Sequence, residues 1–268
     1  APNIDGMLDD PSWQQAIEIA PFTSVRGNDL AQEATRAWMA WDQAHLYVAF
    51  RCDAEVLDPR SNQLDAFQHV TRENDQPSLF KDDYVVLLVD TQADPKVVYD
   101  LFINANGAIN DARCSLPNLW GTRDTQWNSD ARTAARVENG FWTVEIAIPF
   151  TALGGAPAMG QTWGVCIGRT NQALKENSSW MPLSVGYHHA DDFGSIRFDA
   201  AVPGMRDLSL GEVVLGENIA TVRVQSPAPD QPARLFVEIA QAKGAPLRYA
   251  ADAPAGAATE IAAEYELK

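Results

Sequence analysis

Asp82-Asp83-Tyr84-Val85-Val86-Leu87-Leu88-Val89-Asp90 is the stretch that decides the fold. It is a continuous apolar run of strand length that follows two acidic residues. Asn106-Gly107 and Asn139-Gly140 mark tight turns of the kind that join hairpin strands. Further strand patterns occupy 34–40, 46–50, 97–104, 133–137, 141–148, 163–168 and 194–198. Short strands joined by turns at this spacing predict an all-β fold, an antiparallel β-sandwich.

Helical signal is weak, and 11–16 is expected to form one short turn with Pro11 near its start. The polar stretch 57–75 is predicted to be a loop, and loops on a rigid sheet scaffold often carry binding residues. Val202-Pro203-Gly204 contains the Pro-Gly pair typical of a turn or loop and marks a predicted boundary between two domains. We therefore expect a sandwich over 1–200 and a small C-terminal β extension over 201–268. The extension is either a small β domain or the truncated start of a second one, with further domains of a larger chain beyond it.

The composition limits the partners. The net charge is −16, and a field of this sign repels phosphate backbones and anionic lipid. We therefore expect no nucleic-acid partner, and because no apolar run of spanning length exists, no membrane insertion. The chain opens at Ala1-Pro2-Asn3-Ile4 without an export signal. We expect a mature extracytoplasmic protein (secreted, periplasmic or at the cell surface) whose signal has been removed. Cys52 and Cys166 lie in apolar strands and are expected to be buried; one disulfide among the three cysteines remains open.

Ordered motifs resemble those of family 9 carbohydrate-binding modules and their relatives. The first of these motifs is Ile4-Asp5-Gly6-Met7-Leu8-Asp9-Asp10-Pro11-Ser12-Trp13. The later motifs follow in the family's order. They are Trp41-Asp42 with Leu46-Tyr47-Val48-Ala49, the stretch 82–90 quoted above, Phe102-Ile103-Asn104 with Gly107 and Asp111, Phe141-Trp142-Thr143-Val144-Glu145-Ile146-Ala147-Ile148-Pro149, and Ser179-Trp180 before Phe193-Gly194-Ser195-Ile196. The resemblance covers about residues 1–199.

The resemblance implies a β-sandwich, often with structural Ca²⁺, in which two aromatic rings sandwich a sugar. Asn177 and Trp180 match the family's site motif, and Phe80 takes the place of the second ring. Phe can stack on the apolar face of a pyranose with somewhat less area than Trp. Two positions depart from the family: its ligand-binding Glu falls at Val86 and its ligand-binding Arg at Phe102. The fold can therefore be inherited without the site.

Other residues offer alternative sugar contacts. Trp120 and Trp127 lie in the polar loop 118–130, and loops seldom bury two indoles. They form either an alternative aromatic wall, with Arg123 or Asn128 as hydroxyl partners, or, for Trp127, a cap on the sandwich. Arg169, with Asn171, can bind paired hydroxyls or a uronic carboxylate; a salt bridge to an acidic residue is the alternative. The remaining strand and helix tryptophans are predicted to be core: Trp13, Trp38, Trp142 and Trp163.

Acidic and histidine residues give weaker signals. Asp53, Asp58, Asp83 and Asp90 flank strands and are candidates for the Ca²⁺ site, which needs six to eight oxygens. Calcium rests on the resemblance alone. His188-His189 is interpreted as part of a polar loop, because adjacent residues of an extended chain point in opposite directions.

The sequence is compatible with four functions. Non-catalytic binding of an oligosaccharide or polysaccharide by stacking on aromatic side chains is the one that we predict. A structural or interaction domain that has lost the sugar site is the alternative. A glycoside hydrolase would need two facing carboxylates, and no catalytic motif is present. A haem-binding relative would need axial ligands such as Met181 or His188.

Overall fold

The computed structural model describes residues 1–27, 29–54, 70–116, 118–199, 204–209, 216–225, 233–239, 247–254 and 258–267. The chain divides into two compact units, Ala1–Phe198 and Asp199–Lys268, which are described separately below. Part of the predicted loop 57–75, including Asp58, lies outside the described residues, and so do residues 202–203 of the predicted boundary.

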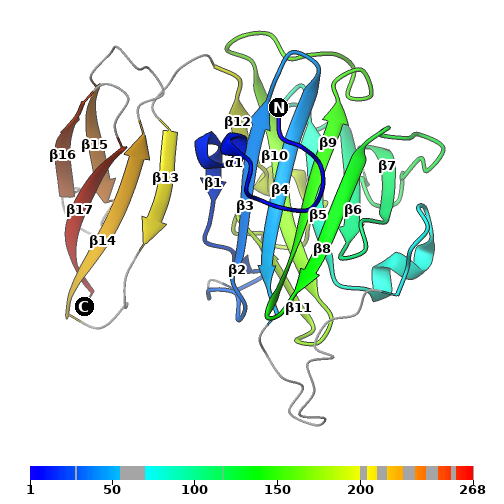
Figure 1. The fold of residues 1–268 in the computed structure, drawn as a ribbon, viewed down its shortest axis with the longest axis horizontal. Helices are drawn as coiled ribbons and strands as arrows, with labels where there is room; N and C mark the ends of the chain where they lie inside the picture. The colour runs from blue at the N-terminus through cyan, green and yellow to red at the C-terminus, as the bar shows by residue number, and fades with distance from the viewer. Residues whose placement is uncertain are drawn as a thin grey trace. The chain divides into compact units, whose positions relative to one another are not determined.

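The first unit consists of two antiparallel sheets, as Figure 1 shows. The five-stranded sheet has the order β1-β3-β4-β9-β8, formed by Ile17–Ile19, Thr35–Trp41, His45–Asp53, Phe141–Pro149 and Arg132–Glu138. The other sheet has the order β2-β11-β10-β5-β6-β7, with β12 also paired to β10. Its strands are Thr23–Ser24, Glu176–Ser179, Thr162–Asn171, Tyr84–Asp90, Val97–Asn104, Ile109–Ser115 and Gly194–Arg197. The predicted β-sandwich is confirmed.

The main hydrophobic core lies between these sheets. Trp142 and Trp163 are buried in it, as predicted, together with aliphatic residues of β4, β5, β6, β9 and β10. Trp13 is buried and Trp38 half-buried in a separate cluster, where α1, Pro11–Gln15, packs against β3. All three cysteines are buried free thiols, so none of them forms the disulfide that the sequence left open.

Strand β5 is buried on both faces. Val85, Leu87 and Val89 face the core between the sheets, whereas Val86 and Leu88 belong to a second cluster on the outer face of the seven-stranded sheet. That outer face is covered by the 3-10 helix η1, Pro77–Lys81, and by the loops around 119 and 181–193. A strand whose residues are all apolar places apolar side chains on both faces of its sheet, so both faces must be buried. The β5 sequence therefore requires the helix and loops that cover the outer face.

Glu145 attaches the N-terminal segment to the five-stranded sheet. Its carboxylate accepts hydrogen bonds from the Trp13 indole Nε1 at 2.6 Å, from the Asp5 amide at 2.9 Å and from the Gly6 amide at 2.7 Å. Gly6 has a φ of +85°, and a Cβ there would lie 3.1 Å from the backbone of Ala135 in β8. Two of the motifs quoted from the sequence therefore meet at one buried carboxylate.

Both predicted hairpin turns are confirmed. Gly107 and Gly140 have φ values of +79° and +85°, between β6 and β7 and between β8 and β9 respectively. The predicted helical turn is α1.

The second unit contains a three-stranded sheet and a two-stranded sheet. The first has the order β13-β14-β17, formed by Gly204–Ser209, Gly216–Gln225 and Ala258–Leu267. The second pairs β15, Ala233–Ile239, with β16, Leu247–Ala253. Ala220, Val222, Ile261 and Ala263 are buried while Ile219 is exposed, as alternation along paired strands requires.

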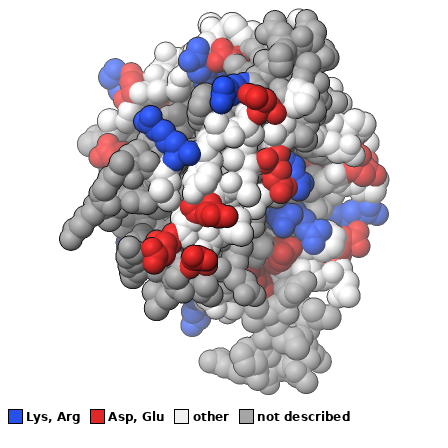
Figure 2. Space-filling view, turned by 90° about the vertical axis from the view of Figure 1, so that its left-hand side faces the viewer, with Lys and Arg blue, Asp and Glu red and all other residues white. Residues whose placement is uncertain are grey.

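The surface drawn in Figure 2 mixes the two signs of charge: Lys and Arg side chains lie among Asp and Glu on this face. In the described part of the chain, no helix combines the length and the apolar character that a membrane span requires.

We expect Glu145→Gln to lower the free energy of unfolding by about 1–3 kcal/mol, because the amide NH₂ would face a hydrogen-bond donor in a buried site. Urea denaturation followed by circular dichroism measures this. Glu138→Gln is the matched control, since Glu138 lies in the neighbouring strand with its side chain 47% exposed. Equal stability of the two variants would contradict the anchoring role of Glu145.

Candidate functional site

An aromatic cluster occupies the outer face of the seven-stranded sheet. Phe80 lies in η1 and meets three other rings edge to face. The distances from its centroid are 5.1 Å to Phe102, 6.0 Å to Tyr84 and 5.6 Å to Trp120. Edge-to-face pairs of this spacing are favourable beyond the area that they bury. The cluster therefore joins η1, the strands β5 and β6, and the loop that follows β7.

Trp120 is the exposed member of the cluster. It retains 51% of its accessible surface although its ring also contacts His188, with centroids 5.1 Å apart. The guanidinium carbon of Arg123 lies 5.1 Å from its centroid and 5.2 Å from that of Phe102, at cation–π distance. Trp120 is thus held by its neighbours while part of the indole faces solvent.

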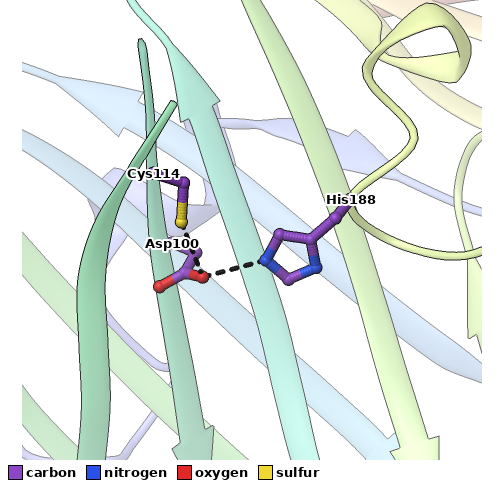
Figure 3. A group of neighbouring side chains, drawn as sticks. All are labelled: Asp100, Cys114 and His188. Atoms are coloured by element: carbon purple, nitrogen blue, oxygen red, sulfur yellow. Dashed lines mark hydrogen bonds and ion pairs between the residues drawn. The ribbon is translucent and has the colours of Figure 1, made fainter. Parts of the chain in front are cut away.

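Asp100 anchors the loops that carry these residues. It lies in β6 and is fully buried. Arg123 donates to both of its oxygens, from Nε to Oδ2 at 2.8 Å and from Nη2 to Oδ1 at 3.0 Å. Figure 3 shows the His188 ring directed at the same carboxylate, and its Nε2 lies 2.9 Å from Oδ2. One carboxylate therefore fixes the loop after β7 and the loop after β11.

The charge state of Asp100 follows from these contacts. Burial opposes its ionisation, but the hydrogen bonds from His188 and Arg123 and the charge of Arg123 outweigh burial and hold the pKa of Asp100 below its ordinary value. The carboxylate is therefore ionised at neutral pH and forms a buried ion pair with Arg123.

Asp100, Cys114 and His188 also group three atoms that can ligate a metal, all within 4.8 Å of one another. These residue types would suit zinc. However, Arg123 already places a positive charge on both carboxylate oxygens. Burial and the adjacent Asp100 raise the pKa of Cys114, whose protonated thiol donates to Asp100 Oδ2 at 3.2 Å. We interpret the group as an ion-pair anchor.

The two tryptophans of the loop 118–130 do not form one wall. Trp120 belongs to the outer-face cluster, whereas Trp127 packs against the core between the sheets, with its ring 5.0 Å from that of Tyr99. Alternation along β6 explains the separation, because Tyr99 and Asp100 point to opposite faces. The Asn128 side chain makes a local contact: its Oδ1 accepts a hydrogen bond from the backbone amide of Asp130.

The residues of the family motif are divided between two places. Trp180 is half-buried against the core between the sheets, over Gly194, whose Cβ would lie 2.8 Å from the indole. Phe80 packs on the outer-face cluster instead. Asn177 is exposed, and its Oδ1 accepts a hydrogen bond from Thr170. A sugar bound between Phe80 and Trp180 stays a prediction.

The two departures from the family pattern are neighbours in space. Val86 and Phe102 are directly paired across β5 and β6, and both are buried in the outer-face cluster. Each therefore contributes packing at a position where the resemblance would have placed a polar ligand contact.

Arg169 forms the salt bridge that the sequence left open as its alternative. Its side chain is 2% exposed, and Nη2 lies 3.2 Å from the carboxylate of Glu33 and 2.6 Å from the carbonyl of Asp53. Asn171 donates to the same Glu33 carboxylate at 2.6 Å. This buried network links the strand β10 to β4 and to the segment that leads into β3.

Asp83 and Asp90, two of the described calcium candidates, lie far apart. Asp83 and Asp90 lie at opposite ends of β5, and seven residues of strand extend over roughly 20 Å. Asp83 accepts a hydrogen bond from the amide of Gln172 and Asp90 from that of Gln92. Asp53 pairs with Arg51. A calcium site therefore stays a prediction from the resemblance.

Sequence reasoning missed Asp100 and His188 as members of the site. Asp100 is the charged residue within the largely apolar strand Val97–Asn104, and an unexplained charge in such a run is a usable signal. His188 lies in a polar loop, and its partner Asp100 is 88 residues away in the sequence, so no local pattern links the two.

Comparison with known proteins agrees with the fold. A family model described as "Carbohydrate family 9 binding domain-like" matches residues 4–199. A family 9 carbohydrate-binding module from Caldicellulosiruptor kristjanssonii, solved in complex with cellotriose, is 16% identical with a TM-score of 0.53, over 75% of this chain and 91% of that one. The complex of such a module from the same organism with glucose is also 16% identical, with a TM-score of 0.52, over 75% of this chain and 93% of that one.

A structure from Bacteroides uniformis is 14% identical with a TM-score of 0.52, over 67% of this chain and 86% of that one. No curated protein matches the chain significantly. At these identities the structures establish a shared fold. Because the family model spans well over half of its length, the chain belongs to the carbohydrate family 9 binding domain-like family.

Proposed function

We propose that this domain binds carbohydrate without cleaving it, and that Trp120 is the stacking surface. The observation that carries the proposal is the combination found at Trp120: the indole is held by three neighbouring aromatic rings and by Arg123, yet is 51% exposed. A ring fixed before binding loses little entropy when a sugar stacks on it. Family membership and the sugar complexes of the structural relatives support the ligand class.

Arg123 supplies a polar contact beside this ring. Its Nε and Nη2 are engaged by Asp100 and Asn110, whereas Nη1 has no hydrogen-bond partner within the described residues. A guanidinium has donors on all three nitrogens. Nη1 is therefore available to a sugar hydroxyl, and the Asp100 ion pair holds it in place.

The same geometry argues against hydrolysis at this site. Asp100 is the carboxylate of the cluster, and it is buried and bound to Arg123 and His188. A glycoside hydrolase needs one carboxyl group that can protonate the leaving oxygen and a second that faces it. The extracytoplasmic location and the structural Ca²⁺ stay predictions.

A structural or interaction role is the second candidate. It is favoured by the burial of Val86 and Phe102, which removes the polar pair that the family resemblance would place there.

Trp120→Ala is expected to weaken binding to the best ligand of an oligosaccharide panel by about tenfold or more, since an aromatic contact of roughly 1.4 kcal/mol corresponds to that factor. Isothermal titration calorimetry measures the affinity. Trp41→Ala is the control, because Trp41 is 38% exposed on β3, in the other sheet. Unchanged affinity in Trp120→Ala would refute the site, and a wild-type protein that binds no glycan would favour the interaction role.

Asp100→Asn is expected to weaken glycan binding and also to lower the free energy of unfolding by about 1–3 kcal/mol, because Arg123 loses its buried counter-charge. Ionised Asp100 stabilises the fold above its unfolded pKa of about 3.9, and this contribution is lost as the pH falls through the lower folded value. Urea titrations from pH 7 to pH 3 should therefore show a smaller acid-dependent loss in the variant. Asp191→Asn, an exposed carboxylate, is the control. An acid profile identical to wild type would contradict this account.

A further inference from the structure

A pocket lies on the other side of strand β6 from the aromatic cluster. Its volume is about 340 Å³, within the range of small-ligand sites. Tyr99 and Arg113 line it and are direct partners across β6 and β7. Strand alternation places them on the face opposite to Asp100 and Phe102. The pocket is therefore separate from the Trp120 site.

Several polar side chains that line this pocket have no side-chain partner among the described residues. The described residues provide no salt bridge for the Arg113 guanidinium and no hydrogen bond for the Tyr99 hydroxyl or the Gln92 side chain, all of which line it. Trp163, 1% exposed, also lines the pocket, and its indole Nε1 is buried without a partner. A buried donor left unpaired costs about 1–3 kcal/mol, so native proteins rarely leave one without a reason.

One wall of the pocket has no side chains. Gly154 and Gly155 have φ values of +88° and +125°, and a Cβ at Gly155 would meet nothing within 4 Å. Residues with these φ values are normally glycines. The wall therefore leaves room for a ligand to approach the backbone.

The charge of the pocket is opposite to that of the chain. Its lining contains Arg113 and neither Asp nor Glu, although the chain has 36 acidic residues and a net charge of −16. Asp90 adjoins the lining residue Thr91, but its Oδ1 accepts the backbone amide of Gln92. An unpaired guanidinium in such surroundings favours a carboxylate, which it can bind through two parallel hydrogen bonds.

We propose that this pocket binds one pyranose unit that carries a carboxylate, a hexuronic acid either free or at the end of an oligosaccharide. Arg113 pairs with the carboxylate, Tyr99 supplies an aromatic contact, and the Gln92 side chain serves the hydroxyls, while the buried Trp163 indole beneath the pocket reports on occupancy. The proposal shares the carbohydrate ligand class with the proposed function but depends on different residues.

The test is a titration of the full chain with glucuronic acid, glucose and acetate, followed by ¹⁵N–¹H NMR of the tryptophan indole groups. Trp163→Phe assigns the Trp163 signal. We expect that signal to shift with glucuronic acid, and glucose and acetate each to bind at least about tenfold more weakly. Arg113→Gln should reduce the glucuronic acid affinity by a similar factor at unchanged melting temperature, because Arg113 is an exposed residue. Arg132→Gln, on the exposed end of β8, is the matched control.

Two variants separate this site from the Trp120 site. Trp120→Ala should leave the Trp163 shift intact even if it abolishes other glycan binding. Equal affinity for acetate would overturn the sugar assignment, and equal affinity for glucose would overturn the role of the carboxylate. An unaffected Arg113→Gln variant, or loss of the shift in Trp120→Ala, would overturn the pocket.

Discussion

Strand β5 must be hidden on both of its faces, and much of the first unit follows from that constraint. Five consecutive residues, Val85 to Val89, are fully buried, which one partner sheet cannot achieve. The core between the sheets covers one face, and η1 with the loops around 119 and 181–193 covers the other. That cover fills the positions of Val86 and Phe102 with apolar contacts and leaves Trp120 at its margin. The exposed indole is thus a consequence of how the outer face is closed.

A charged group inside this apolar cover needs strong compensation. Asp100 obtains it from Arg123 and His188, which approach from different loops. A buried ion pair contributes little net stability compared with an apolar replacement, but it has strict geometric demands. Its role here is therefore positional: the carboxylate holds Arg123 and His188, and through them the two loops that surround Trp120.

The strands with apolar runs and the Asn-Gly turns could be predicted from the sequence, since their signals are local. β11 could not, because Glu176–Ser179 is polar and forms a strand through its backbone pairing with β10. β1 and β2 are too short to show a period. In the candidate site, Phe80 and Trp120 were identifiable as aromatic residues beside polar loops. The Asp100–His188 contact was not, and neither was the division of Trp120 and Trp127 between two faces, because both depend on tertiary placement.

The three buried thiols have a use as reporters of motion. Cys114 and Cys166 lie under the outer-face cover, whereas Cys52 lies between the sheets. Burial raises the pKa of Cys52 to about 12 and that of the other two as well, so all three are unreactive in the closed protein. An alkylating reagent would therefore modify Cys114 and Cys166 whenever the loops lift, but Cys52 only when the sandwich itself separates. Alkylation of the native cysteines would thus distinguish local opening of the loops from separation of the two sheets.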